Sequence, residues 1–274
     1  MTQRPGASCS RTATWGRWAT RPAATSSPTS AAAPSAGSIP AGIAASTPTA
    51  PAASPTDGAL AYTYDALGRL SGTTVSGTTT TTYGYDGDGN LAVQAAGGTA
   101  TRYALDTQGG LPERLGALTT TGGTTTSVWY VRGFGGELAR ETAAGTAWYL
   151  GDRLGSVRAT YGAMAASATA RTDYDPFGTP LAGPGLVAPT DYGYAGEPQD
   201  AATGLVQLRA RWYQPGSGQF TARDPFGGDT GTPRGYNPYG YADADPVNNT
   251  DPTGLFVAVG PLGSGSGAVT IGDG

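Results

Sequence analysis

The sequence contains no histidine and no lysine, because its sixteen basic residues are all arginine. Without histidine there is no Ser-His-Asp or Cys-His nucleophile and no imidazole metal ligand. Without lysine there is no Schiff base and no Gly-Lys phosphate loop. The single cysteine, Cys9, excludes an internal disulfide and a cysteine-rich zinc cluster. We therefore expect no cofactor and no metal ion, and a pair of carboxylates is the catalytic arrangement that stays open.

Large apolar side chains are also scarce. Leu, Ile, Val and Phe make up about 13% of the chain, below the ~20% that ordinary folded proteins exceed. Fifteen tyrosines and a net charge of −4 still favour a folded protein with a thin core. The acidic balance argues against a nucleic-acid partner recognised by a basic surface. No stretch approaches the ~18 apolar residues that span a membrane, so we do not expect a membrane-spanning protein.

The first 56 residues differ from the rest in composition. Ala, Pro, Ser and Thr dominate them, and Asp57 is the first acidic residue. Such a segment buries too little apolar surface to offset its ordering entropy, and its arginines are not followed by the apolar run of a signal peptide. We predict a disordered leader over residues 1–56.

An internal repeat begins soon after this leader. Residues 64–70 read YDALGRL, and residues 85–91 read YDGDGNL, at an offset of 21. The shared core, Asp-x-x-Gly, returns along the chain, with Arg132/Gly135 as a variant that lacks the Asp. The Asp-containing pairs are Asp65/Gly68, Asp86/Gly89, Asp106/Gly109, Asp152/Gly155, Asp175/Gly178, Asp224/Gly227 and Asp251/Gly254. Spacings of about 20 to 26 residues early in the series are typical of a repeat architecture.

Each repeat predicts a β-hairpin. An Asp that caps its own turn and a Gly that can adopt positive φ make a tight reversal. Strand-favouring residues flank these turns, as in residues 78–85, 126–132 and 146–150. No segment has helical periodicity. The predicted fold is all-β, with hairpins packed together because one hairpin cannot bury its own apolar face.

The motifs resemble those of a known family. YDALGRL and YDGDGNL resemble YD repeats, and WYLGDRLGSVRATY, YDPFGTPLA and YGYAGEPQDAATGLVQLRARWYQPGSGQFTARDP resemble the RHS repeat-associated core domain. NPYGYADADPVNNTDPTGL continues that pattern. The resemblance predicts YD/RHS hairpin repeats over residues 57–190, a core region over 191–255 and a short tail over 256–274.

This resemblance implies a function as well as a fold. In the family, and in the related C component of Tc toxin complexes, the repeats coil into a hollow β shell around a C-terminal toxin. The core domain plugs one end of the shell and cleaves the chain after the Leu of a DPxGL motif. Carried over, the cut falls between Leu255 and Phe256, the catalytic aspartates are Asp224 and Asp251, and the associated arginine is Arg211.

Elementary chemistry is compatible with that assignment. Two adjacent carboxylates cannot both ionise cheaply, so they share a proton, and one activates water while the other protonates the leaving amide. Alternation along residues 205–213 predicts one strand with two faces. One face carries Val206, Leu208, Ala210 and Trp212, and the other carries Gln207, Arg209, Arg211 and Tyr213. Arg211 then either keeps one carboxylate ionised or forms a structural ion pair.

Other interpretations stay open at this point. An Asp-Pro pair most often initiates a turn, and the Asp-Pro-Phe-Gly of Asp224 is identical to that of Asp175, to which the family assigns no catalysis. Asp245, in another Asp-Pro pair, is an alternative to either aspartate.

The sequence thus supports two classes of function. The first is a single-turnover, aspartic-peptidase-like module whose substrate is its own C-terminal segment, in a secreted or cell-surface toxin system of bacteria served by a secretion or delivery apparatus. The second is a structural or adhesive envelope protein, with tyrosines that bind carbohydrate. A truncated remnant of the first is a further alternative, since only nineteen residues follow Leu255.

Overall fold

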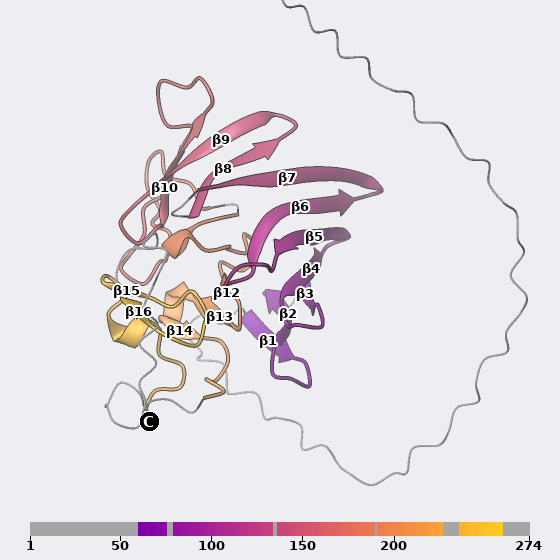
Figure 1. Cartoon of the computed structure of the whole chain (residues 1–274), viewed down its shortest axis with the longest axis vertical. Coiled ribbons are helices and arrows are strands. Elements are labelled where there is room, and N and C mark those ends of the chain that lie inside the picture. The colour runs from indigo at the N-terminus through magenta and orange to yellow at the C-terminus, as the bar shows by residue number, and fades with distance from the viewer. Residues whose placement is uncertain (1–59, 76–78, 134–135, 190, 227–235, 260–274) are drawn as a thin grey trace, which may run out of the picture. The chain divides into compact units, whose positions relative to one another are not determined.

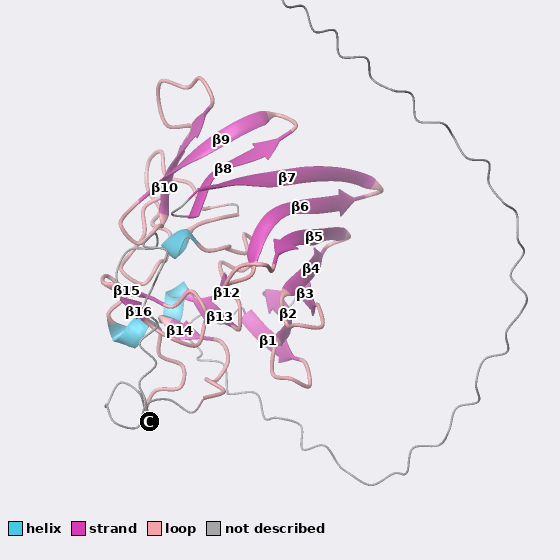
Figure 2. Cartoon of the chain, viewed as in Figure 1, coloured by secondary structure: helices cyan, strands magenta, loops and turns pink. Residues whose placement is uncertain are grey.

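The computed structural model describes residues 60–75, 79–133, 136–189, 191–226 and 236–259. The predicted leader over residues 1–56 and most of the tail lie outside these residues. Strands and loops make up nearly all of the described chain, with three short 3₁₀ turns and no α-helix within the described ranges (Figure 2). The 3₁₀ turns are η1 (Tyr194–Gly196), η2 (Pro215–Ser217) and η3 (Ala242–Ala244). The all-β prediction is confirmed.

One antiparallel sheet of eleven strands forms the first part of the fold, with neighbours in strict chain order (Figure 1). The repeats therefore form one continuous meander. Its strands are β1 (Leu60–Tyr64), β2 (Leu70–Val75), β3 (Thr79–Tyr85), β4 (Leu91–Ala96), β5 (Thr99–Asp106), β6 (Glu113–Thr121), β7 (Thr124–Gly133), β8 (Gly136–Thr142), β9 (Gly145–Gly151), β10 (Val157–Gly162) and β11 (Ala170–Arg171).

The Asp-x-x-Gly turns have the geometry that their residues predict. In the turn between β3 and β4, Asp86 Oδ1 accepts hydrogen bonds from the backbone N–H groups of Asp88 and Asn90, at 3.0 and 2.8 Å. Gly89 has a φ of 89°, in the left-handed region that favours glycine. The turns after Asp65, Asp152 and Asp175 repeat this pattern. Local sequence is therefore sufficient to form these reversals.

Two small sheets follow the meander. The three-stranded sheet comprises β12 (Val206–Leu208), β13 (Arg211–Gln214) and β14 (Gln219–Phe220), and the two-stranded sheet comprises β15 (Asn249–Thr250) and β16 (Ala258–Val259). The turn that the sequence predicts before Phe220 is present as η2 and Gly218, whose φ is 67°.

Tyrosines on one face of the large sheet connect it to the segment that follows. Tyr83 donates to Asp200 Oδ2 at 2.7 Å, and Tyr149 donates to Asp191 Oδ2 at 3.0 Å. Trp212 of β13 packs against Tyr83, with ring centroids 4.7 Å apart, in a cluster that includes Leu205. These tyrosines are used for packing, and they hold β12 and β13 in place against the repeats.

Candidate functional site

Arg211 begins β13, directly after a two-residue turn. Leu208 pairs with Arg211 and Val206 pairs with Tyr213 across that hairpin, so the side chains of each pair share a face. The predicted single strand over residues 205–213 is therefore wrong: the chain reverses at Arg209, whose φ is 50°. Periodicity missed the reversal because the turn contains no Gly, Asn, Asp or Pro.

The guanidinium of Arg211 lies between the two predicted aspartates. Its Nη2 is 3.0 Å from Asp224 Oδ2 and 3.7 Å from Asp251 Oδ2. The two carboxylate oxygens are therefore no further apart than the sum of those distances. Its carbon Cζ lies 3.7 Å from the ring centroid of Phe220, a cation–π contact, and its Nη1 donates to the carbonyl of Pro238 at 3.1 Å. Burial lowers the pKa of Arg211, against the pull of the two carboxylates.

Asp224 is held as part of a turn. Its backbone N–H donates to the carbonyl of Pro238 at 2.9 Å, and its Oδ1 accepts from the N–H of Phe226 at 2.8 Å. This leaves Oδ2 for Arg211. The side chain is 14% exposed, so it is the more solvent-accessible of the two carboxylates.

Asp251 follows β15 and is buried, with 3% of its side chain exposed. Its Oδ1 accepts three hydrogen bonds, from the hydroxyl of Thr253 at 3.0 Å and from the N–H groups of Leu255 and Phe256 at 3.0 and 3.1 Å. Burial raises the pKa of Asp251 to about 6, although Thr253, Arg211 and the two backbone N–H groups act to lower it. A group with this pKa exchanges protons near neutral pH.

The predicted scissile bond lies in the loop between β15 and β16. The pairing of Asn249 with Val259 closes this loop, and the side chain of Asp251 reaches across it to the amide nitrogen of Phe256. The ring of Phe256 packs against Phe226, with centroids 5.5 Å apart. Phe256, on the C-terminal side of the bond, is thus adjacent to the turn that bears Asp224.

Asp245 occupies a different environment. Its two carboxylate oxygens accept hydrogen bonds from the side-chain amide of Asn248, at 3.0 and 3.1 Å, and its N–H closes a turn onto Ala242. The structure groups Arg211 with Asp224 and Asp251, while Asp245 caps its own exposed turn.

Sequence reasoning missed several residues of this cluster. Thr253 supports Asp251 through its hydroxyl, which also accepts from the N–H of Leu255 at 3.0 Å and of Phe256 at 2.9 Å. Phe220 supports the guanidinium of Arg211. A Thr two residues after an Asp signals a side-chain-capped turn, but no local pattern identifies a ring that will lie under an arginine.

The described residues offer no other obvious chemistry. Within the five described ranges, no three His, Cys, Asp or Glu side chains are arranged to hold a metal ion. In the same ranges, no helix has the length and apolar character needed to cross a membrane.

Comparison with known proteins identifies the fold. A family model described as Teneurin YD-shell matches residues 119–247. The tRNA3(Ser)-specific nuclease WapA of Bacillus spizizenii is 31% identical over 206 residues, which is 73% of this chain and 9% of that protein. The chain belongs to the YD-repeat (RHS) family. The Toxin protein Tse5 of Pseudomonas aeruginosa is 34% identical over 79 residues, or 29% of this chain and 6% of Tse5.

Solved structures place this YD-repeat chain in the same fold. The crystal structure of TcdB2-TccC3-Cdc42 matches 72% of the chain with a TM-score of 0.55 and 22% identity, and TcdB2-TccC3 alone gives the same score at 20% identity. The chain covers 10% of either matched chain. Most of this chain is matched, but it spans only about a tenth of the length of the matched proteins.

Proposed function

We propose that this chain is the C-terminal part of a YD-repeat shell protein that cleaves its own backbone once, between Leu255 and Phe256, and thereby releases the segment that follows. Asp224, Asp251 and Arg211 carry out the cleavage. Membership of the YD-repeat family supports the shell. The grouping of Arg211 with two carboxylates, one of which accepts a hydrogen bond from the N–H of Phe256, supports the cleavage.

One observation carries this proposal. Asp251 Oδ1 lies 3.1 Å from the nitrogen of Phe256, which is the atom that must gain a proton when the bond breaks. Asp251 is also joined through Arg211 to a second carboxylate, Asp224. A purely structural Asp-x-x-Gly turn needs neither feature.

The reaction is a hydrolysis with defined proton transfers. Asp224, paired with Arg211 at 3.0 Å, takes a proton from water as the water oxygen attacks the carbonyl carbon of Leu255. The nitrogen of Phe256 then becomes pyramidal and basic, and protonated Asp251 supplies the proton it needs to leave as an amine. Collapse gives a carboxylic acid at Leu255 and an amine at Phe256, and the acid passes its proton to the amine to leave a carboxylate and an ammonium group. The proton that Asp224 took from water then returns to Asp251.

Because the substrate is part of the same chain, the site does not need affinity for a separate substrate molecule. The scissile segment is held beside the carboxylates by its own chain, so effective concentration replaces binding. We expect one turnover per molecule and no cleavage of other chains.

The biological setting follows from the relatives. We propose a secreted or surface-exposed toxin system in competition between bacteria, with the released segment as cargo and a secretion or delivery apparatus as partner. Relatives named as a Toxin protein and as a tRNA nuclease support this setting. One of the relatives named above is a tRNA nuclease, so nucleic acid stays open as a target of the longer proteins, although the acidic charge of this chain argues against it here.

The test compares two identical motifs. The full 274-residue chain is purified and its intact mass is measured under denaturing conditions, where we expect a product ending at Leu255. Asp224→Asn should abolish this product, and Asp175→Asn, in the other Asp-Pro-Phe-Gly, should leave it unchanged. A folded wild-type chain that stays uncut would instead support the structural or adhesive alternative.

A further inference from the structure

The turn between β12 and β13 binds the segment before the proposed cut. The two residues of the turn and the first residue of β13 donate hydrogen bonds to three consecutive carbonyls of that segment. The pairs are Arg209 Nη1 to the carbonyl of Pro252 at 2.7 Å, the N–H of Ala210 to the carbonyl of Thr253 at 3.2 Å, and Arg211 Nε to the carbonyl of Gly254. The turn and the segment therefore run side by side in register.

The backbone of this segment lies so close to the β12–β13 hairpin that there is no room for a side chain at Gly254. A Cβ added to Gly254 would lie 2.2 Å from the carbonyl oxygen of Leu208 and 2.9 Å from the nitrogen of Arg211. Only glycine fits at this position. Two features thus fix the register between the turn and the segment: the close contact at Gly254 and the hydrogen bonds to the three carbonyls.

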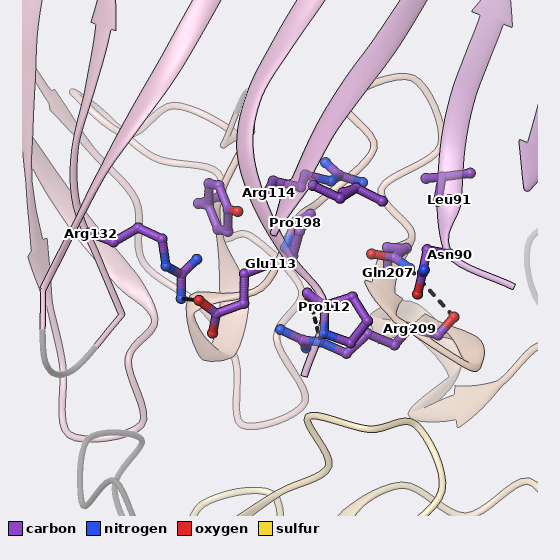
Figure 3. Close-up of a pocket in the computed structure, with 11 residues that line it drawn as sticks. Asn90, Leu91, Pro112, Glu113, Arg114, Arg132, Pro198, Gln207 and Arg209 are labelled. Carbon is purple, nitrogen blue, oxygen red and sulfur yellow. Dashed lines mark hydrogen bonds and ion pairs between the residues drawn. The ribbon is translucent and has the colours of Figure 1, made fainter. Parts of the chain in front are cut away.

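Arg209 is an unexpected residue for this turn. Its φ of 50° lies in the left-handed region, where glycine, asparagine or aspartate is the usual choice in a two-residue hairpin. Its side chain has a specific use that those residues could not supply. The guanidinium donates to Glu197 at 2.6 Å as well as to the carbonyl of Pro252. Its Nε donates to the carbonyl of Pro112 at 3.3 Å (Figure 3).

Glu197 fixes the position of that guanidinium. The carboxylate is 5% exposed, and Glu197 lies in the chain between Asp191 and Asp200, the two residues to which tyrosines of the large sheet donate. Burial raises the pKa of Glu197 to about 7, against the lowering effect of Arg209. A buried ion pair is a weak source of stability, so the contacts that Arg209 makes with Pro252 and Pro112 carry the argument for its role.

We propose that Arg209, held by Glu197, is a positioning residue for cleavage, which aligns the Pro252–Gly254 segment so that the Leu255–Phe256 bond meets Asp224 and Asp251. This inference rests on the proposed self-cleavage. Arg209 does not touch the scissile bond, and it acts through the carbonyl of Pro252. Displacement of a reacting group by about 1 Å can slow a reaction by ~10²-fold, so loss of this contact should be visible in the rate.

The first test measures the rate of cleavage. The full chain is made by cell-free translation, and the cleaved fraction is followed over time by intact mass. The double variant Glu197→Gln/Arg209→Gln removes both charges together, so that neither is left buried alone. We expect it to cleave ~10-fold to 10²-fold more slowly than the wild type, and Arg209→Lys, which keeps one donor, to recover part of the rate.

A matched control separates positioning from general destabilisation. Arg132 and Glu137 form a similar ion pair, with side chains 22% and 9% exposed against 21% and 5% for Arg209 and Glu197. Arg132 also pairs with Glu113, whose side chain is 35% exposed and stays in contact with water when the arginine is removed. Arg132→Gln/Glu137→Gln should cleave at the wild-type rate. Equal slowing of both double variants, or no slowing of either, would overturn the proposed role.

The second test does not depend on cleavage. In the Asp224→Asn chain, which we expect to be uncut, amide hydrogen exchange of Leu255 and Phe256 reports the geometry of the segment. Adding Glu197→Gln/Arg209→Gln should increase exchange at these two amides and leave the central strands of the large sheet unchanged. An uncut wild type would refute the proposed function, whereas unchanged exchange would refute the alignment of the segment by Arg209.

Discussion

The turn at Asp86 and the turn at Asp251 share one motif and differ in chemistry. In both, an Asp side chain accepts backbone hydrogen bonds and a glycine three residues later adopts positive φ. At Asp86 the donors are the N–H groups two and four residues further on, and at Asp251 they are those four and five residues further on. The N–H group five residues after Asp251, that of Phe256, belongs to the proposed scissile bond.

Burial then separates the two carboxylates. Hydrogen bonds from Asn90 lower the pKa of Asp86 at the rim of the sheet, whereas burial raises the pKa of Asp251 to about 6. The comparison teaches that the repeat motif supplies a carboxylate in a fixed geometry, and that the surrounding structure decides whether this carboxylate stabilises a turn or can exchange a proton.

The largest expected effect is on cleavage itself. Asp251→Asn should reduce the cleavage rate by at least ~10²-fold to 10⁴-fold, because it removes the group next to the departing nitrogen of Phe256. Asp86→Asn keeps the side-chain oxygen that caps its turn and should cleave normally. Intact mass over time distinguishes the two, and normal cleavage by Asp251→Asn would refute the two-carboxylate mechanism.

The glycines of the two kinds of turn provide the next comparison. Gly254→Ala combines positive φ with contact against the backbone of Leu208, whereas an added Cβ at Gly68 meets nothing within 4 Å. Gly68→Ala should cost about 1–2 kcal/mol, the ordinary penalty for a side chain in the left-handed region. Gly254→Ala should cost clearly more and also stop cleavage. Urea unfolding of each variant, made in the uncut Asp224→Asn chain, measures the difference, and equal losses would show that the close approach to Leu208 is unimportant.

The pKa of Asp251 is raised and that of Asp86 is lowered, so the two groups make the free energy of unfolding depend on pH in opposite directions. Because folded Asp251 holds its proton more tightly than the unfolded chain does, its contribution to the free energy of unfolding is greatest below pH 4 and is lost as the pH rises through about 6. The change is on the order of 3 kcal/mol. The lowered pKa of Asp86 has the opposite effect. Ionised Asp86 adds to the free energy of unfolding at pH values above the usual pKa of Asp, and this contribution is lost as the pH falls through the lowered pKa.

Two measurements check this dependence. The cleavage rate should fall as the pH rises through about 6, where Asp251 loses its proton. Urea unfolding of Asp224→Asn, with and without Asp251→Asn, should show a difference that shrinks over the same interval. A difference that grows with pH would contradict the raised pKa.

The smallest expected effect concerns the repeat turn alone. Asp86→Ala removes the backbone hydrogen bonds at 3.0 and 2.8 Å from an exposed turn, and should cost about 1 kcal/mol. The cleavage rate should not change. Thermal unfolding checks the first expectation and intact mass the second, and a loss of cleavage would mean that the repeat turns and the site are coupled.

Much of the fold could be predicted from local sequence. The strands around Tyr85, Trp129 and Trp148 and the Asp-x-x-Gly turns follow from β-propensity and turn chemistry, which act over a few residues. The turn after Asp106 is less regular: Gln108 still donates to the carboxylate, but Gly109 is not in the positive-φ region. The loop there is longer, so neighbouring contacts rather than the motif set its path.

The candidate site was less predictable. Family resemblance indicated Asp224, Asp251 and Arg211, and spacing alone could not show that they meet, because 27 residues separate the two aspartates. The roles of these three residues stay predictions. Strand periodicity failed at Arg209, where the turn lacks turn-forming residues and the side chain contacts Glu197 and Pro252 instead.

The repeat, the all-β class and the capped turns follow from local sequence, since each depends on residues that are neighbours in the chain. Long-range contacts in the folded chain select which of the Asp-x-x-Gly turns is buried beside an arginine. That choice depends on the tyrosines that hold β12 and β13 against the large sheet and on the pairing of β15 with β16. These contacts join residues far apart in sequence, and burial, which comes only from such contacts, is what changes the proton affinity of Asp251.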